Sequence, residues 1–164
     1  MNRSYPERPF VGVGALVFRG EKVLLVRRGK PPRKGQWSIP GGMQQTGETV
    51  AEAARREVRE ETGLDVEIGE TVAVIDSIAR DEAGAVEYHY TLVDVIAEWR
   101  AGEAVAGDDA AEVAWTAPDR LQSFELWHET VRVIQLAAAR RKGRRTNAKA
   151  AGPLDIARVS GEIG

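Results

Sequence analysis

Runs of apolar residues alternate with short polar turns in two parts of the chain. Residues 10–18 are apolar apart from two glycines, and residues 22–28 follow after an Arg-Gly-Glu turn, so together they predict a β-hairpin. Residues 65–79 are rich in β-branched side chains, and residues 86–99 follow a turn that contains Gly84. A second pair of strands is therefore predicted there.

Two other segments have the signals of helices. Thr49 followed by Glu52 is typical of a capping box, and Gly63 can adopt the left-handed conformation that ends a helix. A helix is therefore predicted between them. A second helix is predicted over residues 124–140, capped by Ser123. Its apolar stripe consists of Leu126, Trp127, Val131, Ile134 and Ala138. Strands alternating with two helices predict an α/β fold class.

The first helix has acidic residues where apolar ones belong. At about 100° per residue, Val50 and Ala54 mark the inward face, and Glu57 and Glu61 each fall roughly 20° from Val50. Burying unpaired carboxylates is unfavourable, and like charges one turn apart repel.

Two interpretations of these acids stay open. Arg56 lies four residues from both Glu52 and Glu60, so it could pair part of the charge. A hard divalent cation would also resolve the repulsion, because Mg²⁺ prefers carboxylate oxygens together with water and phosphate.

Composition limits the remaining chemistry. The 164 residues have a net charge of −2 and contain no cysteine, which excludes disulfides, thiolate catalysis and zinc–thiolate sites. No apolar run reaches the length of a membrane span, and the N-terminus lacks a hydrophobic signal core. We expect a cytoplasmic protein without membrane contacts, consisting of a single domain over residues 1–139.

Residues 140–164 are expected to form a basic C-terminal tail that is either flexible or an extra helix. Its first ten residues include six basic ones and no acid. Such a tail is usually solvated, although it could contact nucleic acid, a membrane surface or a second subunit. No aromatic residues interleave with the charges, which disfavours binding to single-stranded nucleic acid.

The acidic helix and the loop before it resemble the Nudix box, G-x5-E-x7-R-E-U-x-E-E-x-G-U, where U is aliphatic. Every defined position matches: Gly42, Glu48, Arg56, Glu57, Val58, Glu60, Glu61, Gly63 and Leu64. The resemblance extends as a pattern of elements over about residues 11–139. It implies a Nudix-type α/β/α sandwich with a mixed, curved sheet between helices, and hydrolysis of a nucleoside diphosphate linked to another group.

The resemblance also implies roles for individual residues. Glu57 and Glu61 would be the main ligands of Mg²⁺, with Mn²⁺ as a substitute, and Glu60 would be a third ligand, directly or through water, or would help to orient the nucleophile. Arg56 would hold the glutamates in position. Glu48 is similar to the family's accessory acid. The general base is not assigned.

A later loop supplies one more acid in many family members. By resemblance Glu112 is the candidate metal ligand or base there, ahead of Asp108 and Asp109.

A phosphate ligand would need cations and amides near the acids. The basic loop before the box supplies candidates in Arg27, Arg28 and Arg33, and Gly41 and Gly42 could direct their amides at an anion.

Aromatic residues and a histidine could also belong to the site. Trp37 either packs on the core or stacks on a base, and packing is the preferred interpretation although we include it among the substrate-binding candidates. Core packing is preferred for Tyr88 and Tyr90 over a pocket wall, and a structural role for His89.

The substrate is less clearly indicated. Ala79 stands where many ADP-ribose enzymes of the family have proline, yet residues 80–90 look like those of small ADP-ribose or nucleotide-sugar pyrophosphatases. We rank that class first and hydrolysis of nucleoside triphosphates second. A non-catalytic nucleotide-sensing regulator ranks third, because the box is intact. A homodimer is a family expectation.

Overall fold

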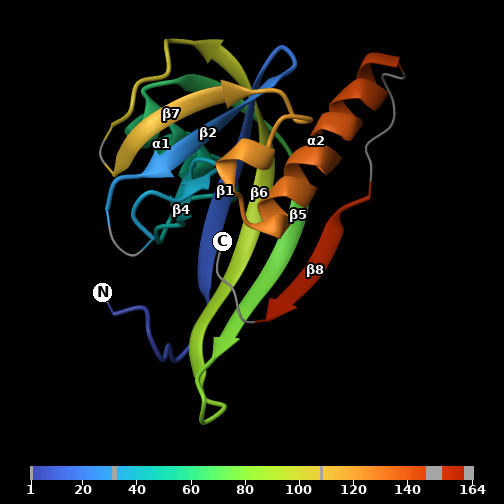
Figure 1. Cartoon of the computed structure of the whole chain (residues 1–164). Helices are drawn as coiled ribbons and strands as arrows, with labels where there is room; N and C mark the ends of the chain where they lie inside the picture. The colour runs from blue at the N-terminus through green and yellow to red at the C-terminus, as the bar shows by residue number, and fades with distance from the viewer. Residues whose placement is uncertain (1, 31–32, 108, 147–152, 161–164) are drawn as a thin grey trace.

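The computed structural model describes residues 2–30, 33–107, 109–146 and 153–160 (Figure 1). Within these ranges, eight strands, two α-helices and one short 3-10 helix follow one another. They are β1 (Phe10–Arg19), β2 (Lys22–Arg28), β3 (Trp37–Ser38), β4 (Gly41–Met43), α1 (Val50–Thr62), β5 (Asp65–Arg80), β6 (Val86–Ala101), β7 (Ala110–Thr116), η1 (Gln122–Phe124), α2 (His128–Thr146) and β8 (Asp155–Ser160).

The strands form one mixed, curved sheet. Its order is β3-β2-β1-β6-β5-β8, with β4 paired to β1 and β7 paired to β2. β1 runs parallel to β6 and β5 runs parallel to β8, whereas the other pairs are antiparallel. Both predicted hairpins, β1–β2 and β5–β6, are confirmed.

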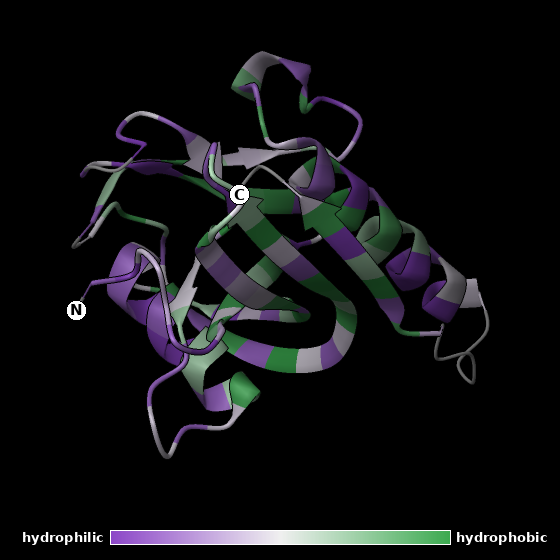
Figure 2. Cartoon of the chain, turned by 90° about the horizontal axis from the view of Figure 1, so that it is seen from below, coloured by the Kyte–Doolittle hydropathy of each residue, from purple (hydrophilic) through white to green (hydrophobic). Residues whose placement is uncertain are grey.

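The sheet is covered on both faces, which explains why β1 is almost continuously apolar. Alternate β1 side chains point to opposite sides: Leu16 and Phe18 join the core beneath α2, and Ala15 and Val17 join the core beneath α1. Hydrophobic residues accordingly gather on the strands, while polar residues lie on the outer surfaces of the helices and in the loops (Figure 2). This is the expected α/β/α sandwich.

The second helix differs from its prediction at both ends. It begins at His128 instead of residue 124, because Ser123 lies in η1 and Glu125 takes a left-handed conformation with φ 51°. That conformation ends η1 before α2 starts. At the other end, α2 continues through Gly143 as far as Thr146.

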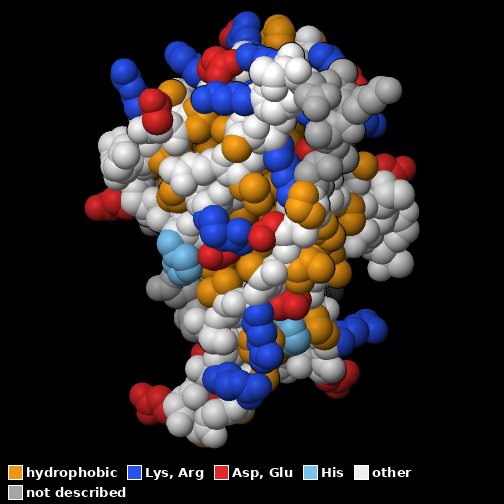
Figure 3. All heavy atoms as spheres, turned by 90° about the vertical axis from the view of Figure 1, so that its right-hand side faces the viewer, with side chains coloured by type: hydrophobic (Ala, Val, Ile, Leu, Met, Phe, Trp, Pro, Cys, Tyr) orange, Lys and Arg blue, Asp and Glu red, His pale blue; other side chains and the backbone are white. Residues whose placement is uncertain are grey.

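Three of the arginines that follow position 140 are paired with acids. Arg141 contacts Glu98 at 2.7 Å and Arg144 contacts Glu70 at 2.6 Å, and Arg145 pairs with Glu21. Strand β8, which was not predicted, then pairs with β5 at the sheet edge. The face over α2 and β8 mixes both charge signs with apolar side chains (Figure 3). No helix in the described residues is long and apolar enough to cross a membrane.

Candidate functional site

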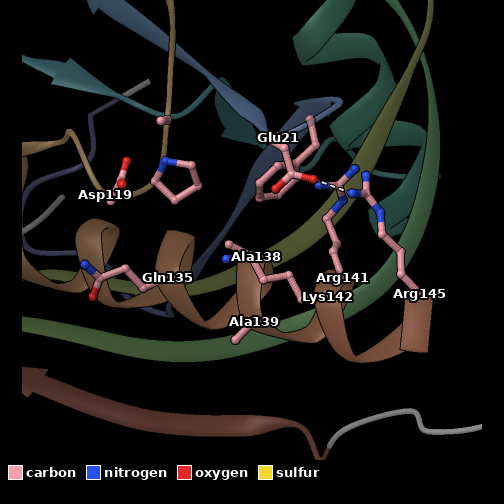
Figure 4. Close-up of a pocket in the computed structure, with 11 residues that line it drawn as sticks. Glu21, Asp119, Gln135, Ala138, Ala139, Arg141, Lys142 and Arg145 are labelled. Atoms are coloured by element: carbon pink, nitrogen blue, oxygen red, sulfur yellow. Dashed lines mark hydrogen bonds and ion pairs between the residues drawn. The ribbon is translucent and has the colours of Figure 1, made fainter. Parts of the chain in front are cut away.

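A cavity of about 860 Å³ lies beside the acidic helix. β1, β6, the segment from Gln36 to Met43 and the start of α2 line it, and Gly12 and Gly14 of β1 leave its floor open. A smaller hollow of about 420 Å³ lies between α2 and the β1–β2 turn, where the Arg145–Glu21 pair sits (Figure 4). No residue of α1 lines that hollow, so the larger cavity is the candidate site.

The ends of α1 are fixed by the local contacts that its sequence predicts. The Glu52 N–H donates to Thr49 Oγ1 at 3.1 Å, and the Thr49 N–H donates to Glu52 Oε2 at 2.7 Å. Gly63 ends the helix with φ 74°, and its N–H donates to the Arg59 carbonyl. These caps, with the buried Ala54 and Val58, determine which face of α1 turns toward β4.

Arg56 joins several acids and a backbone carbonyl of the box. Its guanidinium contacts Glu48 at 2.6 Å, Glu57 at 2.7 Å and Glu60 at 3.2 Å, and it donates to the Met43 carbonyl at 3.0 Å. Hydrogen bonding to Arg56 lowers the pKa of Glu48, and the same bond raises the pKa of Arg56. Part of the acidic charge is therefore paired, as one of the two interpretations anticipated for Glu60, whereas Glu52 bonds Thr49 instead.

Glu57 and Glu61 both have a raised pKa, because their burial disfavours the charged form. Burial raises the pKa of Glu57 despite its bond to Arg56. Burial also raises the pKa of Glu61 to about 8, and the neighbouring Glu57 adds to this, whereas the Gly41 N–H and Arg28 act in the opposite direction. Glu61 Oε2 accepts the Gly41 N–H at 3.3 Å and lines the cavity.

Gly42 is required by contact with Glu57. A Cβ atom at this position would lie 2.4 Å from the Glu57 carboxyl carbon and as close to one of its oxygens. No larger residue fits there unless the carboxylate moves, so the glycine holds open the space beside that carboxylate.

The chemistry of these acids fits a divalent metal ion in part. Glu57 and Glu61 are two half-buried carboxyl groups whose mutual repulsion a hard cation would relieve. Glu60 is instead engaged by Arg56 and its side chain is 45% exposed. Within the described residues, no three acidic or histidine side chains already converge on one point.

The basic loop before the box and the later acidic loop meet at the α1 end of the cavity. Arg28, Lys30, Arg33 and Asp109 line it, and Lys30 contacts Asp109 at 2.6 Å. Hydrogen bonding to Lys30 lowers the pKa of Asp109.

Arg27 and Glu112 do not line the cavity. They face each other across β2 and β7 and form an ion pair at 3.4 Å. The loop acid at the cavity is thus Asp109, which the sequence ranked below Glu112. Asp108 lies outside the described residues.

The aromatic candidates separate in the same way. Trp37 packs edge-to-face on Phe124, with ring centroids 5.1 Å apart, and it does not line the cavity. Tyr88 and Tyr90 both line it. Core packing is nevertheless confirmed for Tyr90, which is 8% exposed and packs on Phe10 with ring centroids 5.9 Å apart, whereas the pocket-wall interpretation describes Tyr88 better. His89 is not among the lining residues.

Sequence reasoning missed the floor of the cavity. Asp94 and Thr130 are each only 8% exposed and both line it. Burial raises the pKa of Asp94 to about 7, with Arg132 acting in the opposite direction. A signal was available: the alternation that puts Tyr90 and Leu92 on one face of β6 places Asp94 there too.

Comparison with known proteins agrees with this geometry. A family model described as NUDIX domain matches residues 8–137. An ADP-ribose pyrophosphatase of Methanocaldococcus jannaschii is 37% identical over 123 residues, which make up 75% of this chain and 70% of that protein. A putative ADP-ribose pyrophosphatase of Bacillus subtilis, YjhB, is 32% identical over 119 residues, 73% of this chain and 55% of that protein. This chain therefore spans little more than half the length of the second relative.

Solved structures share the fold. The crystal structure of a NUDIX hydrolase from Nitrosomonas europaea superposes with a TM-score of 0.72 at 20% identity, covering 94% of this chain and 81% of that one. A MutT NUDIX hydrolase from Burkholderia pseudomallei superposes with a TM-score of 0.68 at 31% identity, covering 79% of this chain and 98% of that one. With the family model over most of its length, the chain is a member of the Nudix hydrolase family.

Proposed function

We propose that this protein hydrolyses the diphosphate bond of a nucleoside diphosphate linked to another group, with ADP-ribose as the preferred substrate and Mg²⁺ as the metal. One observation supports this most directly: Glu57 and Glu61 are half-buried carboxyls beside a glycine-lined cavity whose rim contains Arg28, Lys30 and Arg33. A diphosphate needs such cations, and a metal ion needs such acids.

The protein's own residues would divide the work by position. Arg56 keeps Glu57 in one orientation through a 2.7 Å contact, and the Gly41 N–H does the same for Glu61. Arg28 and Arg33 would offset the charge of the phosphates. Mg²⁺, when bound by Glu57 and Glu61, would supply charge neutralisation and a more acidic water.

The shape of the cavity favours a ligand with two arms. Its lining follows β6 from Asp94 to Tyr88, which is roughly 20 Å at the rise of a β-strand. The acids and the basic loop lie at one end, so a diphosphate bound there leaves room for a further group along β6. Two relatives named as ADP-ribose pyrophosphatases support the same substrate class.

Hydrolysis of a nucleotide panel with Mg²⁺ tests this function. We expect ADP-ribose to give AMP and ribose phosphate, with nucleotide sugars slower and nucleoside triphosphates slower still. Glu61→Gln should lower the rate by about 100-fold or more, while the exposed turn variant Glu82→Gln should match the wild type. Equal rates for wild type and Glu61→Gln on every substrate would refute the role assigned to Glu61. Faster hydrolysis of nucleoside triphosphates than of ADP-ribose would make triphosphates the substrate instead.

A further inference from the structure

Asp94 is a buried acid whose charge has no partner in direct contact. It is 8% exposed, and within the described part of the chain no hydrogen bond or ion pair reaches its carboxyl group. The charged groups that act on it from the packed elements are Arg132 and Glu129 of α2, which bond to each other at 2.7 Å. Buried carboxyls normally have partners, so this one calls for an explanation.

The carboxyl faces the cavity over a glycine. Asp94 is paired with Gly14 across β1 and β6, and Gly14 is paired with Gly41 across β1 and β4. A Cβ atom on Gly14 would lie 2.2 Å from Asp94 Oδ1, so the carboxyl group occupies space that only a glycine leaves free. All three residues line the same cavity.

This arrangement fixes the distance between Asp94 and the proposed diphosphate site. Gly41, which holds Glu61, lies two strands away from Asp94, or roughly 10 Å across the sheet. That separation matches the reach of a ribose attached to a diphosphate, or of the base that such a ribose carries. A phosphate itself does not suit this position, because both Asp94 and the neighbouring Glu129 are acidic.

We propose that Asp94 is a specificity-determining residue that hydrogen-bonds the uncharged sugar or base next to the diphosphate. The inference rests on the proposed function for the location of the diphosphate. The ligand chemistry is a neutral donor beside an acceptor, which a ribose hydroxyl and a base edge both offer. Because burial raises the pKa of Asp94 to about 7, its carboxyl can both accept and donate near neutral pH.

Binding of a non-hydrolysable ligand tests the proposal without turnover. The α,β-methylene analogue of ADP-ribose would be titrated with Mg²⁺ into wild type, Asp94→Ala, Asp94→Asn and a control, Asp76→Asn. Asp76 is half-buried on β5, accepts a hydrogen bond from Thr91 and does not line the cavity. We expect the Kd to rise about tenfold for Asp94→Ala and to stay at the wild-type value for the control.

Two further analogues identify the group that is recognised. One replaces ribose by 2′-deoxyribose and the other replaces adenine by guanine. If Asp94 contacts the sugar, the deoxy analogue loses the difference between wild type and Asp94→Ala; if it contacts the base, the guanine analogue does.

Stability separates recognition from a structural role. Asp94→Asn removes a charge that nothing in direct contact compensates, so the ligand-free variant should melt at the same or a higher temperature than wild type at pH 8. A lower melting temperature, or wild-type Kd values for Asp94→Ala with every analogue, would overturn the proposal. A wild type that binds with Asp94 dependence yet hydrolyses nothing would refute only the proposed function, and a wild type that binds no analogue would refute both.

Discussion

At the α1 end of the cavity the acids are held by partners, whereas on the cavity floor Asp94 has none in contact among the described residues. Arg56 bonds Glu48 and Glu57, and the Gly41 N–H bonds Glu61. The floor contributes a carboxyl to the cavity but no cation that touches it. Partnered acids are fixed in advance, as orienting a metal and a diphosphate requires. An unpartnered acid is available to a ligand.

Removing Arg56 should give the largest effect on the partnered end. Arg56→Ala leaves three carboxyls without their shared cation, so we expect a loss of about 3 kcal/mol of stability and nearly complete loss of hydrolysis. That corresponds to roughly 10 °C in melting temperature for a domain of this size. Thermal melts and ADP-ribose hydrolysis measure both. Arg56→Lys is the matched variant and should recover part of the stability, and an Arg56→Ala protein with wild-type melting would show that the contacts are not stabilising.

Two glycine-to-alanine variants disturb the α1 end and the floor of the cavity separately. In Gly42→Ala the new Cβ would press on the Glu57 carboxyl at 2.4 Å, so kcat should fall by about tenfold or more. In Gly14→Ala it would press on Asp94 Oδ1 at 2.2 Å, so KM for ADP-ribose should rise by about tenfold with a smaller change in kcat. If both variants changed kcat and KM in the same way, the distinction between the α1 end and the floor would not hold.

The pH dependence of metal-free stability sharpens the comparison. The pKa of Glu61 is raised to about 8 and that of Asp94 to about 7, so between pH 5 and 8 the folded state binds more protons than the unfolded state. Stability should therefore fall as pH rises through this window. Carboxyls with a lowered pKa, such as Glu48, stay ionised throughout it and do not oppose the trend.

Mg²⁺ should reverse that fall only where Glu61 is present. The melting temperature of wild type in a chelator should be several degrees lower at pH 8 than at pH 5.5, and Mg²⁺ should restore more at pH 8 because protons no longer compete for the carboxylates. In Glu61→Gln the Mg²⁺ effect should be largely lost. A Mg²⁺ effect of equal size in Glu61→Gln would place the metal elsewhere.

The later acids should give the smallest effects. Glu112→Gln removes an exposed ion pair with Arg27 outside the cavity, so kcat and KM should stay within about twofold of wild type. Asp109→Asn changes an acid that lines the cavity and contacts Lys30, so its effect on kcat/KM should be larger, about fivefold. A larger loss for Glu112→Gln would restore the ranking that the sequence alone suggested.

The partnered end could be predicted from sequence because its determinants are local. The capping box, the Gly63 stop and the spacing of Glu57 and Glu61 all lie within about twenty residues, so helical geometry alone brings them together. The role of Arg56 in holding the glutamates came instead from the resemblance to the Nudix box, because helical spacing alone offered only Glu52 and Glu60 as its partners.

The floor of the cavity could not be predicted in the same way. Asp94 meets Gly14 only because β6 runs parallel to β1, a pairing between residues eighty positions apart. The choice between Asp109 and Glu112 depends on how β7 pairs with β2, and the register places Glu112 opposite Arg27. Strand β8 lacks a strong alternation of apolar and polar residues in its sequence, and it pairs in parallel with β5.

The division between the α1 end and the floor is tested most directly by steady-state kinetics. ADP-ribose hydrolysis would be measured in wild type, Glu61→Gln and Asp94→Ala. We predict that Glu61→Gln lowers kcat by about 100-fold or more even at saturating substrate, whereas Asp94→Ala raises KM by about tenfold and leaves kcat within about threefold. If Asp94→Ala instead lowered kcat as much as Glu61→Gln with KM unchanged, recognition and reaction would not be separated along this cavity.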